Sequence, residues 1–88
     1  MKIMFLFTQA DNGDKEVIID IDKISALVPV WATDFKDATE IHMDNGDKFT
    51  VKDDANSIVD AIVEAKKDDN TSSGFFRINE DCKLEYLG

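Results

Sequence analysis

Alternating hydrophobic and polar residues dominate the first half of the chain, and a helical period takes over after residue 52. Alternation of period two is typical of strands that bury one face. Five such segments follow one another over residues 1–52, with turn residues between most of them. This pattern predicts a small antiparallel five-stranded meander that curves strongly or forms an open barrel.

The run DNGDK occurs twice, at residues 11–15 and 44–48, each time between two strand segments. Asn-Gly between two strands is a strong hairpin signal. Calcium loops are the alternative, but they need alternating carboxylates over about a dozen residues and a closing glutamate. Neither run has that spacing, so we predict a turn in both places and no metal site.

The register of each hairpin follows from the length of its loop. A two-residue turn would pair odd positions with even ones and would scramble the apolar faces. A three-residue loop, with Gly13 or Gly46 in the left-handed region, pairs odd positions with odd ones. The predicted cross-strand pairs are then Ile3 with Ile21, Phe5 with Ile19, Phe7 with Val17, Ile41 with Phe49 and Thr39 with Val51. Both hairpins gain one apolar face, and the two turn glycines have a structural role.

Hydrophobic residues recur at helical spacing in the run DDANSIVDAIVEAKK. The run predicts a helix over residues 54–67 that is capped by Asp53 or Asp54 and packs on the sheet. The stripe expected to be buried consists of Ile58, Val59, Ile62 and Val63. Residues 68–74 then form a polar linker, and residues 75–87 form a C-terminal hairpin. We therefore predict a single α+β domain of 88 residues with the element order β-β-β-β-β-α-β-β.

The third strand segment carries the one proline of the chain. Pro29 lacks an N–H group, which places it at a sheet edge or at a bulge. The apolar row of this segment consists of Ile24, Ala26, Val28 and Val30. Trp31 is out of phase with that row, and residues 32–37 form a polar connection that contains Phe35.

An aromatic pair beside an edge proline is a common anchor for a protein partner or a flat ligand. The candidate binding residues are Pro29, Trp31, Asp34, Phe35 and Asp37. The alternative is that both aromatic side chains fold back over the core as a lid.

Composition narrows the classes of partner. Nineteen acidic residues against ten basic ones give a net charge of −9, and no basic stripe is present to bind nucleic-acid phosphates or anionic lipid. The negative charge either keeps the chain in solution by self-repulsion or fits a basic site on a partner. No apolar run approaches the roughly 20 residues that span a bilayer. The single cysteine, Cys82, cannot form an internal disulfide, so we expect it in the core and the protein in the cytoplasm.

Catalytic chemistry has little support in the sequence. His42, the one histidine, alternates with Ile41 and Met43, so its side chain is expected to leave the apolar face. General acid–base catalysis needs poised groups that converge in a pocket. No phosphate-binding glycine loop, Cys/His metal spacing or nucleophile motif accompanies the histidine. We therefore predict that the protein is not an enzyme, has no catalytic residues and takes no metal or cofactor.

Residues 16–67 resemble the FlbD family of small flagellar and swarming-motility proteins. The matching runs are VIIDIDKI and TEIHMDNGDKFTVKDDANSIVDAI, the second of which leads through an Asn-Gly turn into an Ile/Val helix. The chain departs from the family in its first hairpin loop, in its longer connection at 31–37 and in a C-terminal hairpin that the short members lack. The resemblance implies a non-enzymatic protein, and it carries no catalytic residues over.

The leading functional hypothesis is a small acidic binding protein that acts through a protein partner or through self-association as a homo-oligomer. A second hypothesis is an acidic inhibitor of the kind that phages and mobile elements make, directed at a nucleic-acid-binding or defence protein. A third is a protein that sequesters a small molecule at an oligomer interface. The fold does not separate these hypotheses, but salt does, because an acidic mimic loses affinity steeply with salt and an aromatic anchor does not.

Overall fold

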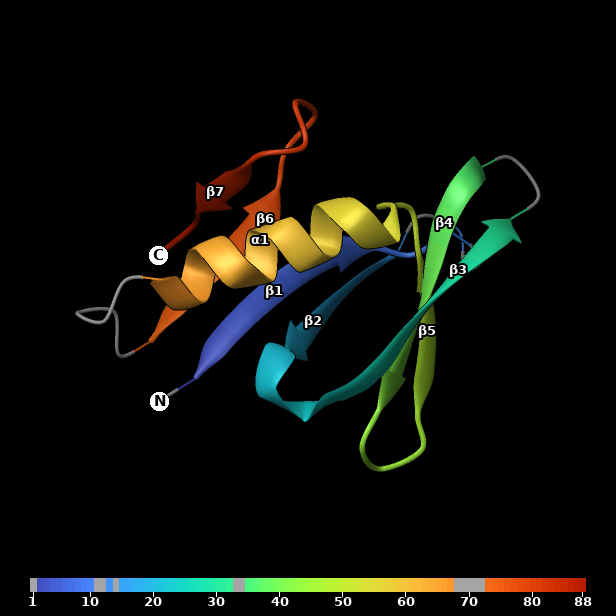
Figure 1. The fold of residues 1–88 in the computed structure, drawn as a ribbon, viewed down its shortest axis with the longest axis horizontal. Helices are drawn as coiled ribbons and strands as arrows, with labels where there is room; N and C mark the ends of the chain where they lie inside the picture. The colour runs from blue at the N-terminus through green and yellow to red at the C-terminus, as the bar shows by residue number, and fades with distance from the viewer. Residues whose placement is uncertain (1, 11–12, 14, 33–34, 68–72) are drawn as a thin grey trace.

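The computed structural model describes residues 2–10, 13, 15–32, 35–67 and 73–88, and of residues 31, 32, 35 and 36 it describes the backbone only. Within these residues the structure has seven strands and one α-helix in the predicted order, so the α+β class is confirmed (Figure 1). The strands are β1 (Ile3–Thr8), β2 (Glu16–Asp20), β3 (Ile24–Ala32), β4 (Phe35–Met43), β5 (Lys48–Val51), β6 (Gly74–Ile78) and β7 (Leu84–Tyr86). The helix α1 spans Ala55–Lys67, and a 3₁₀ turn spans Ile21–Lys23.

The strands form two sheets rather than one meander. The first sheet has the order β2-β1-β6-β7, and the second has the order β3-β4-β5. β6 runs parallel to β1, because the chain crosses over through α1 before it returns to the first sheet. The 3₁₀ turn separates β2 from β3, and the Asp22 N–H starts it by donating to Asp20 Oδ1 at 3.0 Å. The expected five-stranded meander over residues 1–52 is therefore divided after β2, and the sheets do not close into a barrel.

Backbone contacts join the two sheets where β1 ends. The Lys52 N–H donates to Thr8 O at 3.0 Å, and the Ala10 N–H donates to Thr50 O at 2.8 Å. Between these two bonds lies a single bridge from residue 9 to residue 51. The end of β1 therefore runs beside β5, and both sheets enclose one core.

The second DNGDK run is a turn, and the hairpins around both runs have the predicted register. Four of the five predicted pairs are present: Phe5 with Ile19, Phe7 with Val17, Ile41 with Phe49 and Thr39 with Val51. The fifth pair, Ile3 with Ile21, is absent from the ladder because Ile21 belongs to the 3₁₀ turn that follows β2. Gly13 has a φ of 63° and Gly46 a φ of 96°, values that favour glycine. The Met43 N–H donates to Asp47 O at 2.8 Å and closes the second loop. Residues 11, 12 and 14 of the first run lie outside the described residues.

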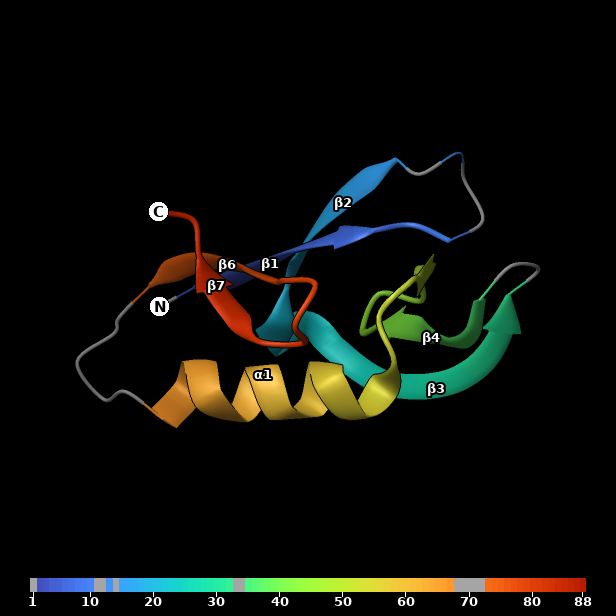
Figure 2. The same cartoon turned by 90° about the horizontal axis from the view of Figure 1, so that it is seen from above.

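The core lies between the two sheets and α1, and Figure 2 shows the helix along one face of the first sheet. Its largest fully buried hydrophobic side chains are Phe5, Phe7, Ile19, Ile41, Val51 and Ile58. Thr39 is the buried polar side chain among the described residues, and its Oγ1 donates to Asp53 O at 2.8 Å. That bond satisfies the hydroxyl group inside the core and ties β4 to the segment that leads into the helix.

The helix buries a different stripe from the predicted one. The buried stripe consists of Ile58, Ala61 and Ala65. Ile62 is half-buried against the core, whereas Val59 and Val63 are 46% and 58% exposed. Two alanines on the buried face let the helix backbone approach the sheet closely, which larger side chains there would prevent. The prediction was right for Ile58, right in part for Ile62 and wrong for both valines.

Asp54 caps α1 and is one of the two predicted capping residues. The Ser57 N–H donates to Asp54 Oδ2 at 3.2 Å, and Ser57 Oγ donates to Asp54 Oδ1 at 2.6 Å. These bonds satisfy a first-turn amide, so the helix begins at Ala55. In the described part of the chain, no helix has the length and the apolar character of a membrane span.

β3 is an edge strand, which confirms the predicted position of Pro29. A β-bulge near the start of the strand shifts the phase of its side chains. Leu27 therefore lies opposite Ile41 and packs against the core, while Val28 is exposed. The predicted apolar row of Ile24, Ala26, Val28 and Val30 is therefore right for Ile24, which packs against the core, and wrong beyond the bulge, where Ala26 and Val28 are exposed.

Two predicted connections are shorter than expected. β3 continues to Ala32 and β4 begins at Phe35, so most of the polar connection at 32–37 belongs to paired strands. Gly74 is the first residue of β6 and not the last residue of a linker. The other linker residues, 68–72, lie outside the described residues, and residue 73 directly precedes β6.

The C-terminal hairpin forms as predicted, with Phe76 opposite Tyr86 and Ile78 opposite Leu84. Cys82 lies in the turn of this hairpin at a φ of 61°, and it is exposed. The expectation of a core position for this cysteine is therefore wrong, because the turn extends beyond the sheet (Figure 1).

Candidate functional site

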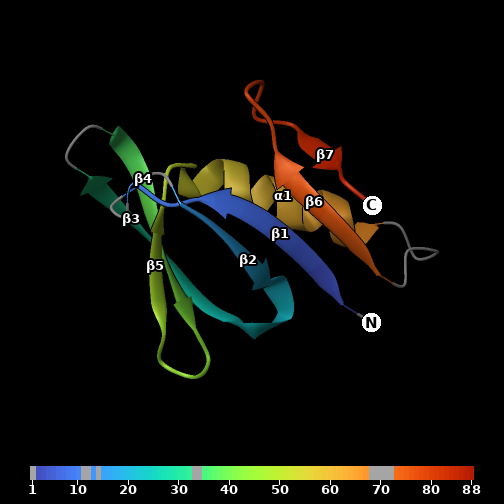
Figure 3. The same ribbon diagram turned by 180° about the vertical axis from the view of Figure 1, so that it is seen from behind.

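Among the described residues, α1 packs on one face of the first sheet and no element covers the other face. Figure 3 shows β1, β2 and β6 in front of α1, so the helix packs on their far side. Side chains alternate along each strand, and those next to the buried Phe5 and Phe76 point away from the core. We call this side the outer face, and its apolar residues are Met4, Leu6, Ile18, Phe75 and Leu87.

Strand pairing brings these five side chains together. Leu6 lies opposite Ile18 on β2, and Met4 lies opposite Phe75 on β6. The Leu87 N–H donates to Phe75 O at 2.7 Å, which extends the row past β7. Ile18 is 55% exposed and Leu87 is 37% exposed, so the patch is open to solvent. Contiguous exposed apolar patches are typical of interaction surfaces, so the outer face is a candidate for one.

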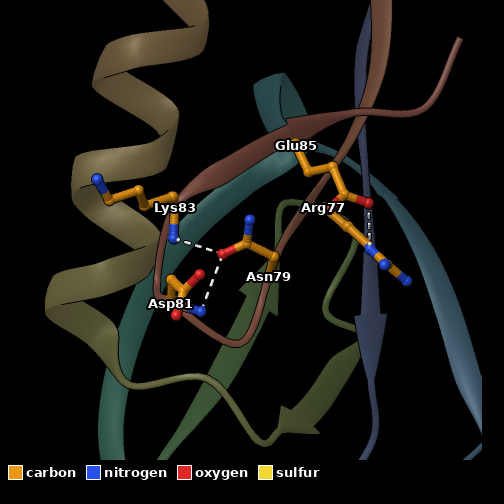
Figure 4. Close-up of polar contacts among 5 residues, drawn as sticks. All are labelled: Arg77, Asn79, Asp81, Lys83 and Glu85. Atoms are coloured by element: carbon orange, nitrogen blue, oxygen red, sulfur yellow. Dashed lines mark hydrogen bonds and ion pairs between the residues drawn. The ribbon is translucent and has the colours of Figure 1, made fainter.

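One end of the outer face is charged. Arg77 lies opposite Glu85, and its Nε donates to Glu85 Oε2 at 2.8 Å (Figure 4). In the turn that follows, Asn79 Oδ1 accepts from the N–H groups of Asp81 and Lys83 at 3.0 and 3.1 Å. Asn79 therefore holds the turn in shape, and the ion pair connects β6 to β7.

A groove of about 660 Å³ opens at this charged end. It is lined by Leu6 and Thr8 from β1, by the β6–β7 turn and by residues 52 and 53 after β5. Its carboxylates are Glu16, Asp53, Glu80, Asp81 and Glu85, and its cations are Lys52 and Arg77. Acidic groups therefore outnumber basic ones in the groove, which favours a partner that carries cations.

Two neighbouring carboxyl groups, Asp53 and Asp54, have opposite pKa shifts. Burial raises the pKa of Asp53 above the usual 3.8, and the charge of Asp54 raises it further. The hydrogen bond from the Ser57 hydroxyl lowers the pKa of Asp54 below 3.8. The folded state therefore disfavours the ionised form of Asp53 and favours the ionised form of Asp54.

Replacing Asp54 with alanine is expected to lower the free energy of unfolding by about 1 kcal/mol at neutral pH, because α1 loses its cap. The stability from ionised Asp54 is present above pH 3.8 and is lost as the pH falls through the lowered pKa. Thermal melts of the variant across the acid range measure this loss.

Asp53→Asn is the matched control, and its effect on stability at neutral pH is expected to have the opposite sign. It should raise the melting temperature at neutral pH, because it removes a buried charge that the folded state disfavours. The gain should fade as the pH drops through the raised pKa of Asp53 and should vanish below 3.8, where the carboxyl is protonated in both states. A lower melting temperature for Asp53→Asn at neutral pH contradicts this account.

The predicted binding segment borders a second hollow. Pro29 and Asp37 are exposed, and both line a hollow of about 600 Å³ between the β3–β4 ladder and the start of α1. The backbones of Trp31 and Phe35 belong to β3 and β4, but their side chains lie outside the described residues, as does all of Asp34. The structure therefore brings together two of the five predicted residues and leaves the other three as predictions.

His42 leaves the apolar face, as predicted. Its Nε2 lies 2.6 Å from Glu40 Oε1 on the same strand, so the two residues form a local pair away from both hollows. Within the described residues, no three His, Cys, Asp or Glu side chains are placed to hold a metal ion.

The outer face was absent from the predicted sites, although a signal for it exists. The runs IMFLF and VII place hydrophobic residues at both phases of the alternation, which is typical of strands with two apolar faces. One face of β1 and β2 packs the core, and the other is left uncovered. The groove has no comparable signal, because Glu16, Asp53 and Glu85 come from three distant segments.

Comparisons with protein-family models, with curated proteins and with solved structures found no match for this chain. Its function therefore has to be inferred from its own surfaces.

Proposed function

We propose that this protein acts without catalysis, by binding a protein partner on its outer face. The observation that carries the proposal is Ile18, which is 55% exposed at the centre of an edge strand, lies opposite Leu6 and belongs to the five-residue apolar patch of the outer face. A single exposed isoleucine is ordinary, but a contiguous patch is not. A partner that removes the patch from water gains about 25 cal/mol for each Å² of apolar surface.

The proposal includes a cytoplasmic location and a non-enzymatic role like that of the FlbD family. An exposed, unpaired thiol such as Cys82 suits a reducing compartment. The short FlbD proteins are not known as enzymes, which agrees with a binding role. A function in flagellar or swarming motility follows if the partner belongs to that machinery.

The acidic groove favours a second candidate function. Its five carboxylates and the net charge of −9 suit an inhibitor that occupies a basic nucleic-acid-binding site, as phage and mobile-element proteins do. Charge would then dominate the affinity, so binding should weaken steeply with salt.

A competing surface for the first function is the hollow beside residues 29–37. Edge strands are natural pairing sites, and Pro29 on β3 limits open-ended stacking while leaving part of the edge usable for a partner or a second copy. Trp31→Ala tests the predicted aromatic anchor of this segment, and the double change Asp34→Asn with Asp37→Asn tests its predicted charge.

Partner capture with matched baits tests the proposal. The full chain and the variants Ile18→Asn and Val63→Asn are immobilised, exposed to a lysate of the native host, and the retained protein is identified and purified. Ile18 and Val63 are 55% and 58% exposed, so the two variants differ mainly in the face they alter. The affinity of the purified partner is expected to fall by about tenfold for Ile18→Asn, and to stay unchanged for Val63→Asn.

Equal affinity for the unchanged chain and for Ile18→Asn contradicts the proposal. If Trp31→Ala abolishes binding instead, the predicted binding segment around Pro29 is the working surface. If the Asp34 and Asp37 changes abolish binding, the charge of that segment is required. If Glu16→Gln with Glu80→Gln abolishes binding, Ile18→Asn does not, and the affinity falls steeply with salt, the protein is an acidic inhibitor that acts through its groove.

A further inference from the structure

We infer that the segment that docks on the outer face is a basic amphipathic helix. The inference rests on the proposed function and adds the shape and the charge of the partner. Two observations carry it: the width of the apolar patch across the sheet, and the acidic groove that adjoins the patch at Leu6.

The width of the patch fits one helix. It crosses the sheet diagonally, because Ile18 and Leu6 form one row on β2 and β1, and the next row consists of Met4 on β1, Phe75 on β6 and Leu87 just past β7. Three strand spacings of about 4.8 Å make roughly 14 Å, and a helix with its side chains is about 10–12 Å wide. The sheet already binds α1 on its other face through the stripe Ile58, Ala61 and Ala65. A partner helix with a comparable apolar stripe would complete a second helical layer on the same sheet.

The charge beside the patch selects a basic helix. Leu6 belongs both to the outer face and to the groove, so apolar and acidic surfaces are continuous there. Glu16 and Glu80 are exposed groove residues, and Arg77 is already paired with Glu85. A helix with Lys or Arg along one border of its apolar stripe would place those cations in the groove while its apolar side chains cover Ile18.

The same charges disfavour the other occupants of the outer face. A second copy would bring two chains of charge −9 together and would set one acidic groove against another. An anionic membrane surface would be repelled for the same reason.

Two model peptides test the inference on the full chain. The first is a fluorescently labelled helix of leucine and lysine of ~18 residues, or about five turns, and the second has glutamate in place of lysine. Fluorescence anisotropy measures the affinity of each peptide for the unchanged protein. The lysine peptide is expected to bind, and the glutamate peptide is expected to bind at least about tenfold more weakly.

Matched variants then locate the binding site of the lysine peptide. Ile18→Asn should weaken binding by about tenfold, whereas Val63→Asn on α1 should not. The pair Glu16→Gln with Glu80→Gln should weaken binding severalfold, whereas Asp60→Asn with Glu64→Gln, which removes two exposed charges from α1, should not. Thermal melts confirm that each variant folds.

Three results would overturn the inference: no binding of the lysine peptide, equal binding of both peptides, or equal losses for the outer-face variants and their α1 controls. Dimerisation that disappears in Ile18→Asn would also overturn it, because a second copy would then be the occupant. The proposed function is tested separately by the captured partner. A partner that depends on Ile18 but is not a basic helix leaves that function standing and removes only the inference.

Discussion

Phe5→Ala is expected to lower the free energy of unfolding by about 3–5 kcal/mol, the largest effect of any single change considered. Phe5 is 0% exposed on β1, the strand that lies between β2 and β6. Its ring centroid lies 5.8 Å from that of Phe7 and 6.0 Å from that of Phe76. Truncation therefore leaves a cavity where three rings meet. A small domain has only about 5–15 kcal/mol of stability, so urea unfolding should show a large shift of the midpoint.

Leu6→Ala is the control for this prediction. Leu6 is the next residue on the same strand, but it is half-buried and points to the outer face. Its truncation removes fewer buried contacts, so the loss should be well below that of Phe5→Ala. Equal losses for the two variants would mean that the faces of β1 are assigned wrongly.

Ile58→Ala is expected to lower the free energy of unfolding by about 2–4 kcal/mol, the second-largest effect. Ile58 is 0% exposed in the first half of α1 and belongs to the core cluster. Its neighbour Val59 is 46% exposed, so Val59→Ala should change the stability by less than about 0.5 kcal/mol. Alanine also has the better helix propensity of the two, which offsets part of any lost contact at position 59.

The stability losses of Ile58→Ala and Val59→Ala, measured by urea unfolding, therefore show which face of α1 packs against the core. A larger loss for Val59→Ala than for Ile58→Ala would show that α1 presents its valine side to the core. That outcome would restore the stripe that the hydrophobic pattern alone predicts.

The hairpins could be predicted because their signals are local. Asn-Gly sets the turn, and the parity of the flanking apolar residues then leaves one register that keeps Ile41 and Phe49 on the same face. The cap of α1 is equally local, since Asp54 and Ser57 are three residues apart. Each of these features depends on a few neighbouring residues.

The features that could not be predicted depend on distant contacts. Nothing near Gly74 indicates that β6 will pair in parallel with β1, because that partner lies at the other end of the chain. The rotation of α1 is set by how closely Ala61 and Ala65 let it approach the sheet. The bulge that turns Leu27 inward changes the phase of β3, and the sequence of this strand contains no glycine that would indicate a bulge.

The candidate site also has one part that could be predicted from local sequence and another that depends on distant contacts. The apolar character of β1 and β2 at both phases is visible in the sequence, so Leu6 and Ile18 could have been chosen as surface candidates. Phe75 and Leu87 join the same patch only because β6 pairs in parallel with β1. The groove also depends on that pairing, because the β6–β7 turn lines it beside β1. In the predicted binding segment, the edge position of β3 could be predicted, because Pro29 cannot donate a hydrogen bond to a neighbouring strand. The hollow that Pro29 and Asp37 border could not, because α1 forms its other side.

Amide chemical-shift mapping of the purified partner on the ¹⁵N-labelled chain tests the central claim most directly. If the outer face is the working surface, the largest shifts should fall on β1, β2, β6 and β7, around Leu6, Ile18 and Phe75. Shifts that concentrate instead on β3 and on residues 29–37, with the amides of β1 and β2 unchanged, would contradict the account.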